Sequence, residues 1–188
     1  MGQNSYLEAM LIEAGCSTVP VQACDTPPGG NLSRVPFYAK SDFFTRPLNH
    51  AGVNALLAGV ERLRGLRGAP RGAGSIAFDA LGGAVNRLHP QVTAFVHRTA
   101  LFGAQYYTGW TWPGTAAGRS GQYKWITAYH NSMRPFASGQ SYQNYPDPSL
   151  VNWRQAYYGV NYNRLSQIKG IYDPHNLFRF PQAVTPTV

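Results

Sequence analysis

The sequence predicts an α+β fold in which a mostly antiparallel sheet carries helices packed on one face. Periodic segments follow one another in the order helix, strand, helix, strand, hairpin, helix, strand, helix. The hairpin, expected over residues 92–110, would make neighbouring strands antiparallel. The chain has 188 residues, of which 44% are hydrophobic, and this is enough for one domain with a sizeable core.

Four segments are expected to form helices. Residues 5–15 begin at a capping box of Ser5 and Glu8 and end at Gly15. Apolar residues recur at helical spacing in the other three: residues 51–63, residues 122–134, and a final helix that starts near Leu150 and ends at Asp173-Pro174. Buried stripes are expected on each, including Leu7, Met10, Leu11 and Ala14 on the first helix and Tyr158, Tyr162, Leu165, Ile168 and Tyr172 on the last.

The strands are expected over residues 35–44, from Ile76 to Asp79, over the two arms of the hairpin and at residues 141–147. The hairpin arms, residues 92–98 and 101–110, are separated by a two-residue turn at Thr99-Ala100. Glycine and proline pairs at residues 27–30 indicate a turn rather than a phosphate loop, because neither the spacing nor a following helix fits one.

The composition excludes some classes of protein and leaves others open. The net charge is +8, with a dense basic run from Arg62 to Arg71, but this run lies at a helix end, and no groove-reading motif accompanies it. We therefore expect no nucleic-acid partner. No apolar run is long enough to cross a membrane, and residues 1–20 show no signal peptide, so a soluble protein is expected, either cytoplasmic or secreted.

Two cysteines, Cys16 and Cys24, are separated by seven residues. They form either a disulfide or two buried thiols, and no Cys or His cluster indicates a metal site. Lys40 and Asp42 lie close together on the first strand. They are either catalytic or, as we favour, a local ion pair or turn cap.

The segment Ser141–Asp147 holds the candidate site. Read as a strand, it places Tyr142 and Asn144 on one face, where a phenol and a carboxamide together can exchange a proton and form hydrogen bonds. The alternative is an edge strand whose tyrosines have no chemical role. Asp79, just before Gly82-Gly83, is either a site carboxylate or a solvated acid at a strand end. His97, at the hairpin corner, is more often structural than catalytic.

Downstream, the chain reads YYGVNYNRL from Tyr157 and KGIYDPHNLF from Lys169. With the preceding Tyr-x-Asn-Tyr-x-Asp, these motifs resemble the C-terminal signature of the berberine-bridge-enzyme-like family of FAD-linked oxidases. The resemblance extends from about Cys16 to the C-terminus. It implies that residues 1–148 are part of a substrate-binding domain, which is incomplete, and that residues 149–188 are the C-terminal berberine-like segment. The family's FAD-binding domain has no counterpart in the sequence.

The resemblance also implies roles for individual residues. Tyr142 would be the catalytic base, assisted by Asp79, and Asn144 would bind the flavin together with Tyr142. Gln105 would contact a small-molecule substrate, a sugar or secondary metabolite, with Tyr107 on the same face of its strand. FAD would be the cofactor of the complete enzyme, held by another domain or by a separate FAD-binding chain. The alternative is a catalytically silent fragment or binding module. We expect Tyr142, Gln105 and Asp79 to share the face of the sheet that the helices leave uncovered.

Overall fold

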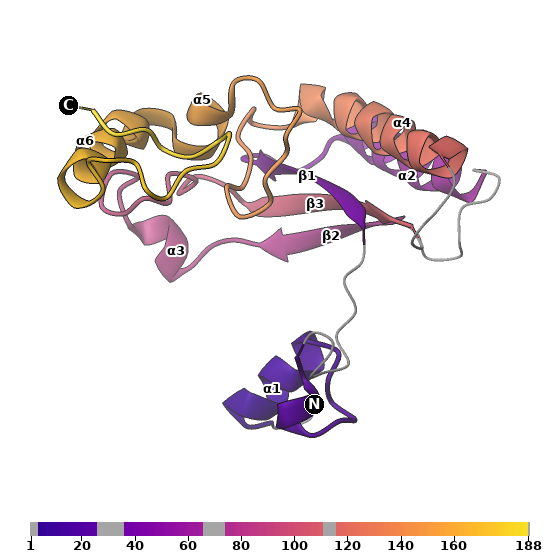
Figure 1. Cartoon of the computed structure of the whole chain (residues 1–188). Coiled ribbons are helices and arrows are strands. Elements are labelled where there is room, and N and C mark those ends of the chain that lie inside the picture. Colours follow the sequence, from indigo (N-terminus) through magenta and orange to yellow (C-terminus); the bar gives the residue numbers. More distant parts are fainter. Residues whose placement is uncertain (1–3, 26–35, 66–73, 111–115, 188) are drawn as a thin grey trace. The chain divides into compact units, whose positions relative to one another are not determined.

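The computed structural model describes residues 4–25, 36–65, 74–110 and 116–187, and it divides into two compact units (Figure 1). Residues 1–36 form the first unit and residues 37–188 the second, so each is described by itself. The turn predicted at residues 27–30 and part of the basic run, including Arg67 and Arg71, lie outside the described residues.

The first unit contains helix α1 (Tyr6–Glu13) and the short helix η1 (Val21–Ala23). The predicted capping box is confirmed: the Glu8 N–H donates to the Ser5 hydroxyl at 3.3 Å, and the Ser5 N–H donates to the Glu8 carboxylate at 2.7 Å. Cys16 and Cys24 are joined by a disulfide, which settles the alternative left open by their spacing. The prediction that α1 buries an apolar stripe is wrong within this unit, since no residue of α1 is buried.

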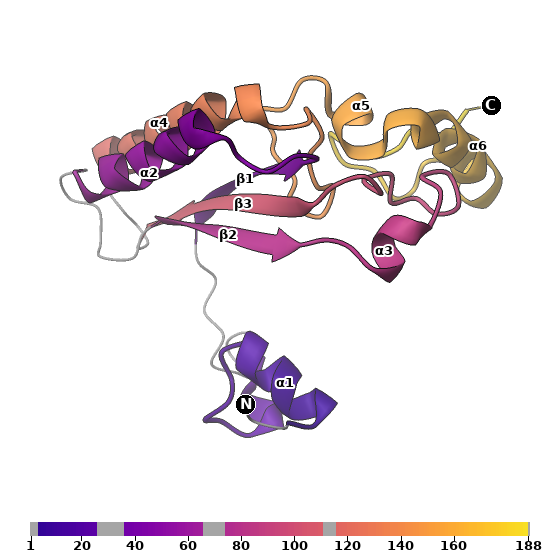
Figure 2. The ribbon, with the colours of Figure 1, turned by 180° about the vertical axis from the view of Figure 1, so that it is seen from behind.

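The second unit is built on a three-stranded antiparallel sheet, which confirms the predicted fold class. Strands β1 (Phe37–Phe44), β2 (Gly74–Ala80) and β3 (Phe102–Gly109) lie in the order β1-β3-β2. Helices α2 (His50–Arg64) and α4 (Ala116–Met133) cover the same face of this sheet (Figure 2). The other face is free of them.

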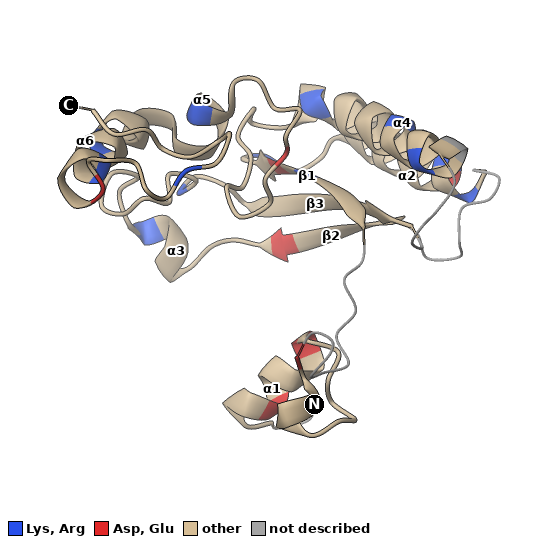
Figure 3. Ribbon diagram, in the orientation of Figure 1, with Lys and Arg blue, Asp and Glu red and all other residues tan. Residues whose placement is uncertain are grey.

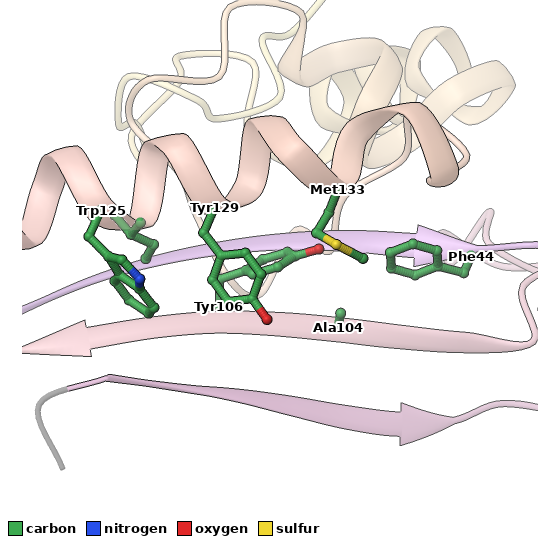
Figure 4. Packing of buried hydrophobic residues seen from close by; sticks show 7 residues of the cluster. Phe44, Ala104, Tyr106, Trp125, Tyr129 and Met133 are labelled. Atoms are coloured by element: carbon green, nitrogen blue, oxygen red, sulfur yellow. The ribbon is translucent and has the colours of Figure 1, made fainter. Parts of the chain in front are cut away.

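The core lies between α4 and the sheet (Figure 4). Phe44, Ala104 and Tyr106 reach it from the strands, and the residues that α4 contributes are Trp125, Ile126, Tyr129 and Met133. Two side chains of α4 also bind the backbone of α2: the Trp125 indole donates to the Gly59 carbonyl at 2.8 Å, and the Tyr129 hydroxyl donates to the Leu56 carbonyl at 2.9 Å. The two helices are therefore held together by hydrogen bonds as well as by packing.

Gly59 lets α2 and α4 approach closely. A Cβ atom at Gly59 would lie 2.1 Å from the Tyr129 ring, so Gly59→Ala forces the helices apart. We expect this substitution to lower the free energy of unfolding by about 1–3 kcal/mol, as overpacking does. Gly121→Ala, on α4, is the control: nothing lies within 4 Å of that Cβ, and a gain of about 0.5–1 kcal/mol is expected. Urea denaturation measures both, and equal effects would contradict this account of the packing.

The predicted strand at residues 92–98 is wrong, and with it the hairpin. Side chains satisfy the carbonyl groups that a strand ladder would have used. The Asn161 amide donates to the carbonyls of Pro90 and Thr93 at 2.7 and 3.0 Å, and the Arg98 guanidinium donates to that of Phe95 at 3.1 Å. Asn161 lies 71 positions from Pro90 and 68 from Thr93, so its bonds could not be predicted from the local pattern.

The final helix is broken, which also differs from the prediction. It consists of α5 (Trp153–Tyr158), the short helix η3 (Gly159–Asn161) and α6 (Tyr162–Tyr172), with Gly159 at a φ of +49° where they meet. Tyr172 is 84% exposed and is not part of a packed face. Other differences are small: α4 begins at Ala116, and the short helices α3 (Ala84–Arg87) and η2 (Arg134–Phe136) were not predicted.

Candidate functional site

The segment Ser141–Asp147, here called the Tyr142 segment, is not a strand as predicted but a turn bound to the outer edge of β1. The Tyr145 N–H donates to the Tyr142 carbonyl at 3.0 Å, which closes the turn. The Tyr142 N–H donates to the Ser41 hydroxyl, and the Ser141 hydroxyl donates to the Ser41 carbonyl, both at 2.9 Å. Tyr142 and Asn144 still lie side by side, because the Asn144 amide donates to the Tyr142 hydroxyl at 2.9 Å.

Tyr142 and Asp79 line the same cavity, which has a volume of about 300 Å³. In the register of the sheet, Asp79 lies opposite Gly103, and Gly103 lies opposite Phe43. Paired residues of an antiparallel sheet point to the same face, and Phe44, Ala104 and Tyr106 on the alternate positions point into the core under α4. The cavity therefore lies on the face that the helices leave uncovered.

The walls of the cavity are aromatic. The Tyr142 ring makes edge-to-face contacts with the rings of Phe43 at 6.0 Å, Phe95 at 6.3 Å and Tyr145 at 5.0 Å between centroids, and all four residues line the cavity. Burial, the negative charge of Asp79 and the neighbouring Tyr142 together raise the pKa of Tyr145. Tyr145 therefore stays protonated at neutral pH, and it can donate a hydrogen bond into a site that contains a carboxylate.

Gln105 and Tyr107 lie further along the same face of β3. Both alternate with Tyr106, which points into the core, so they share the face of Gly103. Neither is among the residues that line the cavity, and the Tyr107 ring stacks on Phe37 with centroids 5.3 Å apart. The structure thus brings Tyr142, Asn144 and Asp79 together and places Gln105 and Tyr107 beside them.

The sequence interpretation missed Tyr145, Phe43 and Phe95 as parts of this site. The motif Tyr-x-Asn-Tyr could have indicated Tyr145, because Tyr145 follows Tyr142 by three residues and a turn brings residues at that spacing together. No local signal marks Phe43 or Phe95, which reach Tyr142 from distant parts of the chain.

His97 packs against Phe43, one of the residues that line the cavity. It is fully buried and stacks on the Phe43 ring with centroids 4.1 Å apart, and its Nδ1 lies 3.0 Å from the Gln140 amide oxygen. Burial lowers the pKa of His97 below its ordinary value, so the ring is neutral at pH 7. His97 does not line the cavity, which agrees with a structural position.

Asp42 and Lys40 each form an ion pair with a residue distant in the sequence. The local ion pair or turn cap that the sequence interpretation favoured is therefore wrong. The Asp42 carboxylate is completely buried, with His130 Nε2 at 3.2 Å and Arg134 Nη1 at 3.4 Å. Lys40 Nζ lies 2.7 Å from Asp147 Oδ2, at the end of the Tyr142 segment. Burial alone would raise the pKa of Asp147, but hydrogen bonds from Lys40 and Ser149 outweigh it and lower that pKa.

The lowered pKa of Asp147 predicts a pH dependence of stability. Its folded-state pKa lies below the unfolded value of about 3.9, so ionised Asp147 stabilises the fold above that pH. This contribution is lost as the pH falls through the folded-state value. We expect the gap in urea midpoint between the native chain and Asp147→Asn to shrink as the pH falls from about 6 to about 3. A gap that stays constant over this range would contradict the assignment.

Basic residues are distributed over several helices and loops of the described chain (Figure 3). Within the described ranges, no helix combines the length and hydropathy needed to span a membrane. Over the same residues, no three or more His, Cys, Asp or Glu side chains gather in a way that could hold a metal ion.

Comparisons with known proteins point to one group of enzymes. Residues 141–185 match the family model described as berberine and berberine-like. The chain is similar to an uncharacterized FAD-linked oxidoreductase of Bacillus subtilis, YgaK, with 35% identity over 159 residues, which cover 85% of this chain and 33% of that protein. It is also similar to a chitooligosaccharide oxidase of Gibberella zeae, with 34% identity over 119 residues, or 59% of this chain and 24% of that one.

A solved structure gives the same result. The chain is similar to the berberine-bridge-enzyme-like protein 1 of Physcomitrella patens, with a TM-score of 0.75 and 28% identity, over 97% of this chain and 37% of that structure. The chain spans about a third of the length of the curated relatives it matches first.

Proposed function

Because the chain belongs to the berberine-bridge-enzyme-like family of FAD-linked oxidoreductases, we propose that it forms the substrate side of an FAD-dependent oxidase. The substrate would carry a hydroxyl group. The observation that carries the proposal is the convergence of Tyr142 and Asp79 on one cavity of the uncovered sheet face. We further propose that residues 1–148 act as the substrate-binding part and residues 149–188 as the berberine-like segment.

The donor set of this face fits a flavin ring. The cavity has aromatic walls of the kind that pack against a flat ring. Asn144 is exposed, and its amide donates to the hydroxyl of Tyr142, which lines the cavity. Asn144 and Tyr142 would hold the ring by hydrogen bonds. Bound FAD supplies the redox chemistry, accepting a hydride and passing its electrons to oxygen. The parts of FAD beyond the ring would be held outside this chain.

The residues of this chain would bind the substrate and move its proton. Tyr142 would take the proton from the substrate hydroxyl, and Asp79 would accept a proton from Tyr142 in turn. Phe43, Phe95 and Tyr145 would hold the phenol in place and exclude water from the proton transfer. Gln105 and Tyr107 would contact parts of the substrate that extend along β3.

A sugar is the substrate class that we propose. Aromatic rings pack well against the apolar faces of sugar rings, and Asp79 and Gln105 offer hydrogen bonds to their hydroxyl groups. The relative from Gibberella zeae is named as a chitooligosaccharide oxidase, which supports this choice. Secondary metabolites with an accessible hydroxyl are the second class.

The catalytically silent binding module is the second candidate. It would bind a partner through the exposed apolar side chains of the C-terminal segment and carry out no reaction itself. In the active form, the flavin would come with a separate FAD-binding chain or with further residues of the same protein. Such a partner would cover the exposed apolar side chains of the C-terminal segment: Ile171, Tyr172, Leu177, Phe178 and Phe180.

We expect the 188-residue chain, expressed alone, to purify without flavin absorption. None of its motifs resembles the glycine-rich loop that holds a pyrophosphate at a helix N-terminus. Absorption spectroscopy of the purified chain after incubation with FAD checks this. Stoichiometric flavin that survives gel filtration would show that the chain holds the cofactor by itself.

The experiment that tests the function uses a hybrid enzyme, in which these residues replace the corresponding segment of an FAD-linked relative. Oxygen uptake with a panel of sugars and other alcohols is then measured. The proposal predicts turnover of at least one sugar. A hybrid that folds and binds flavin but oxidises none of the panel would favour the silent module.

A further inference from the structure

Lys40 is a buried lysine, 4% exposed, in the middle of strand β1. Lysine is almost never buried without a partner, because removing its charge from water is costly. Its partner, Asp147, is 7% exposed and lies 107 positions away in the sequence. Lys40 Nζ donates to the Asp147 carboxylate at 2.7 Å and to the Ser149 hydroxyl at 2.6 Å. This pair connects strand β1 to the end of the Tyr142 segment.

Lys40 and Ser41 are neighbours on β1, so their side chains point to opposite faces of the sheet. Ser41 binds the beginning of the Tyr142 segment, through the Tyr142 N–H and the Ser141 hydroxyl. Lys40 binds its end, through Asp147. The segment therefore crosses the outer edge of β1, with four residues, 143–146, between the Tyr142 N–H and Asp147.

Asp147 is itself held by several bonds. Its carboxylate accepts hydrogen bonds from the Ser149 N–H at 2.9 Å and the Ser149 hydroxyl at 2.7 Å. Its N–H donates to the Tyr157 hydroxyl at 2.9 Å, and its carbonyl accepts from the Gln182 amide at 2.7 Å. Asp147 is thus a fixed point of the C-terminal half, and Lys40 joins that point to the sheet.

We propose that the Lys40–Asp147 ion pair is a positioning device that holds the Tyr142 phenol over the cavity, opposite Asp79. The inference rests on the role proposed for Tyr142. Lys40 and Asp147 do not line the cavity, so they act through the Tyr142 segment and not on a substrate. With both ends of the Tyr142 segment fixed, the phenol has few orientations left. A phenol that must meet a hydroxyl at hydrogen-bond distance needs such restriction.

The test uses the chain as it is, without flavin. Lys40→Met leaves Asp147 as an unpaired buried charge, which can destabilise the whole unit. The double variant Lys40→Met/Asp147→Asn removes both charges. It therefore tests the loss of the Lys40–Asp147 ion pair without leaving a buried charge that could unfold the unit. Lys169→Met is the matched control, because it breaks the ion pair between Lys169 and Asp173 in the same C-terminal half.

Amide hydrogen exchange and a fluorine label on Tyr142 supply the readouts. In the double variant we expect exchange at residues 142–149 to become at least about tenfold faster, while exchange in α4 stays within about twofold. The fluorine resonance of 3-fluorotyrosine at position 142 should shift or broaden. Lys169→Met should change neither. Unchanged exchange and resonance in the double variant, or exchange that rises equally in α4, would overturn the proposal.

In the hybrid enzyme, the double variant should lower kcat for a sugar and leave KM nearly unchanged, because orientation of the base is lost while binding remains. A raised KM at constant kcat would also overturn the positioning role. The proposed function has a separate test: it fails if Tyr142→Phe leaves the activity of the hybrid enzyme unchanged. The exchange and fluorine measurements use the isolated chain, so their results do not depend on whether Tyr142 is the base.

Discussion

Replacing Tyr142 by Phe in the hybrid enzyme should slow anaerobic flavin reduction by about 10²- to 10⁴-fold, the usual loss when a general base is removed. The substitution deletes one oxygen atom and keeps the ring, so the edge-to-face contacts with Phe43, Phe95 and Tyr145 survive. Flavin binding should stay intact. Stopped-flow absorbance of the flavin under anaerobic conditions measures the rate directly.

Tyr123→Phe is the matched control for Tyr142→Phe. Tyr123 belongs to α4, on the covered side of the sheet, and its ring lies beside Tyr38. The same atom is removed there, and we expect no change in the rate of flavin reduction. If Tyr142→Phe behaved like Tyr123→Phe, Tyr142 would not be the base, and the aromatic cavity would serve binding alone.

The largest effect on stability is expected from Asp42→Asn. Its carboxylate is completely buried between His130 and Arg134, so the amide would leave the Arg134 guanidinium without its counter-charge. Breaking a buried ion pair from one side costs about 3–5 kcal/mol. Arg134 is 32% exposed and water can reach it, so we expect a loss of about 3 kcal/mol. Urea denaturation, with the slope checked for two-state behaviour, measures the loss.

Asp79→Asn makes the same chemical change on the same sheet and serves as the control. Asp79 is exposed on the uncovered face, so the change in the free energy of unfolding should stay within about 0.5 kcal/mol. Equal losses for the two variants would contradict the view that Asp42 is structural and Asp79 is available for chemistry.

The elements that local chemistry determines were predicted well. The capping box of α1, the helix over α2 and the strands around β1 and β3 depend on residues a few positions apart, and all are present. The strand at residues 92–98 was predicted wrongly because Asn161, from a distant part of the chain, takes up its carbonyl groups. The final helix breaks at Gly159, which has a positive φ. Hydrophobic periodicity alone does not predict such a break.

In the candidate site, too, the features set by neighbouring residues were predicted and those set by distant residues were not. A motif of neighbouring residues pointed to Tyr142 and Asn144, and these two do contact each other, although the segment is a turn and not a strand. The partner of Lys40 could not be predicted, because 107 positions separate it from Asp147 and only the folded chain brings them together. The aromatic walls at Phe43 and Phe95 depend on packing in the same way.

The central claim is that Tyr142 and Asp79 act as one unit in proton removal. A double-mutant cycle of Tyr142→Phe and Asp79→Asn on the rate of anaerobic flavin reduction in the hybrid enzyme tests it most directly. The account predicts strong coupling: each single variant is slow, and the double variant is about as slow as Tyr142→Phe alone. Losses that simply multiply, or an Asp79→Asn rate equal to that of the unmodified hybrid, would contradict it.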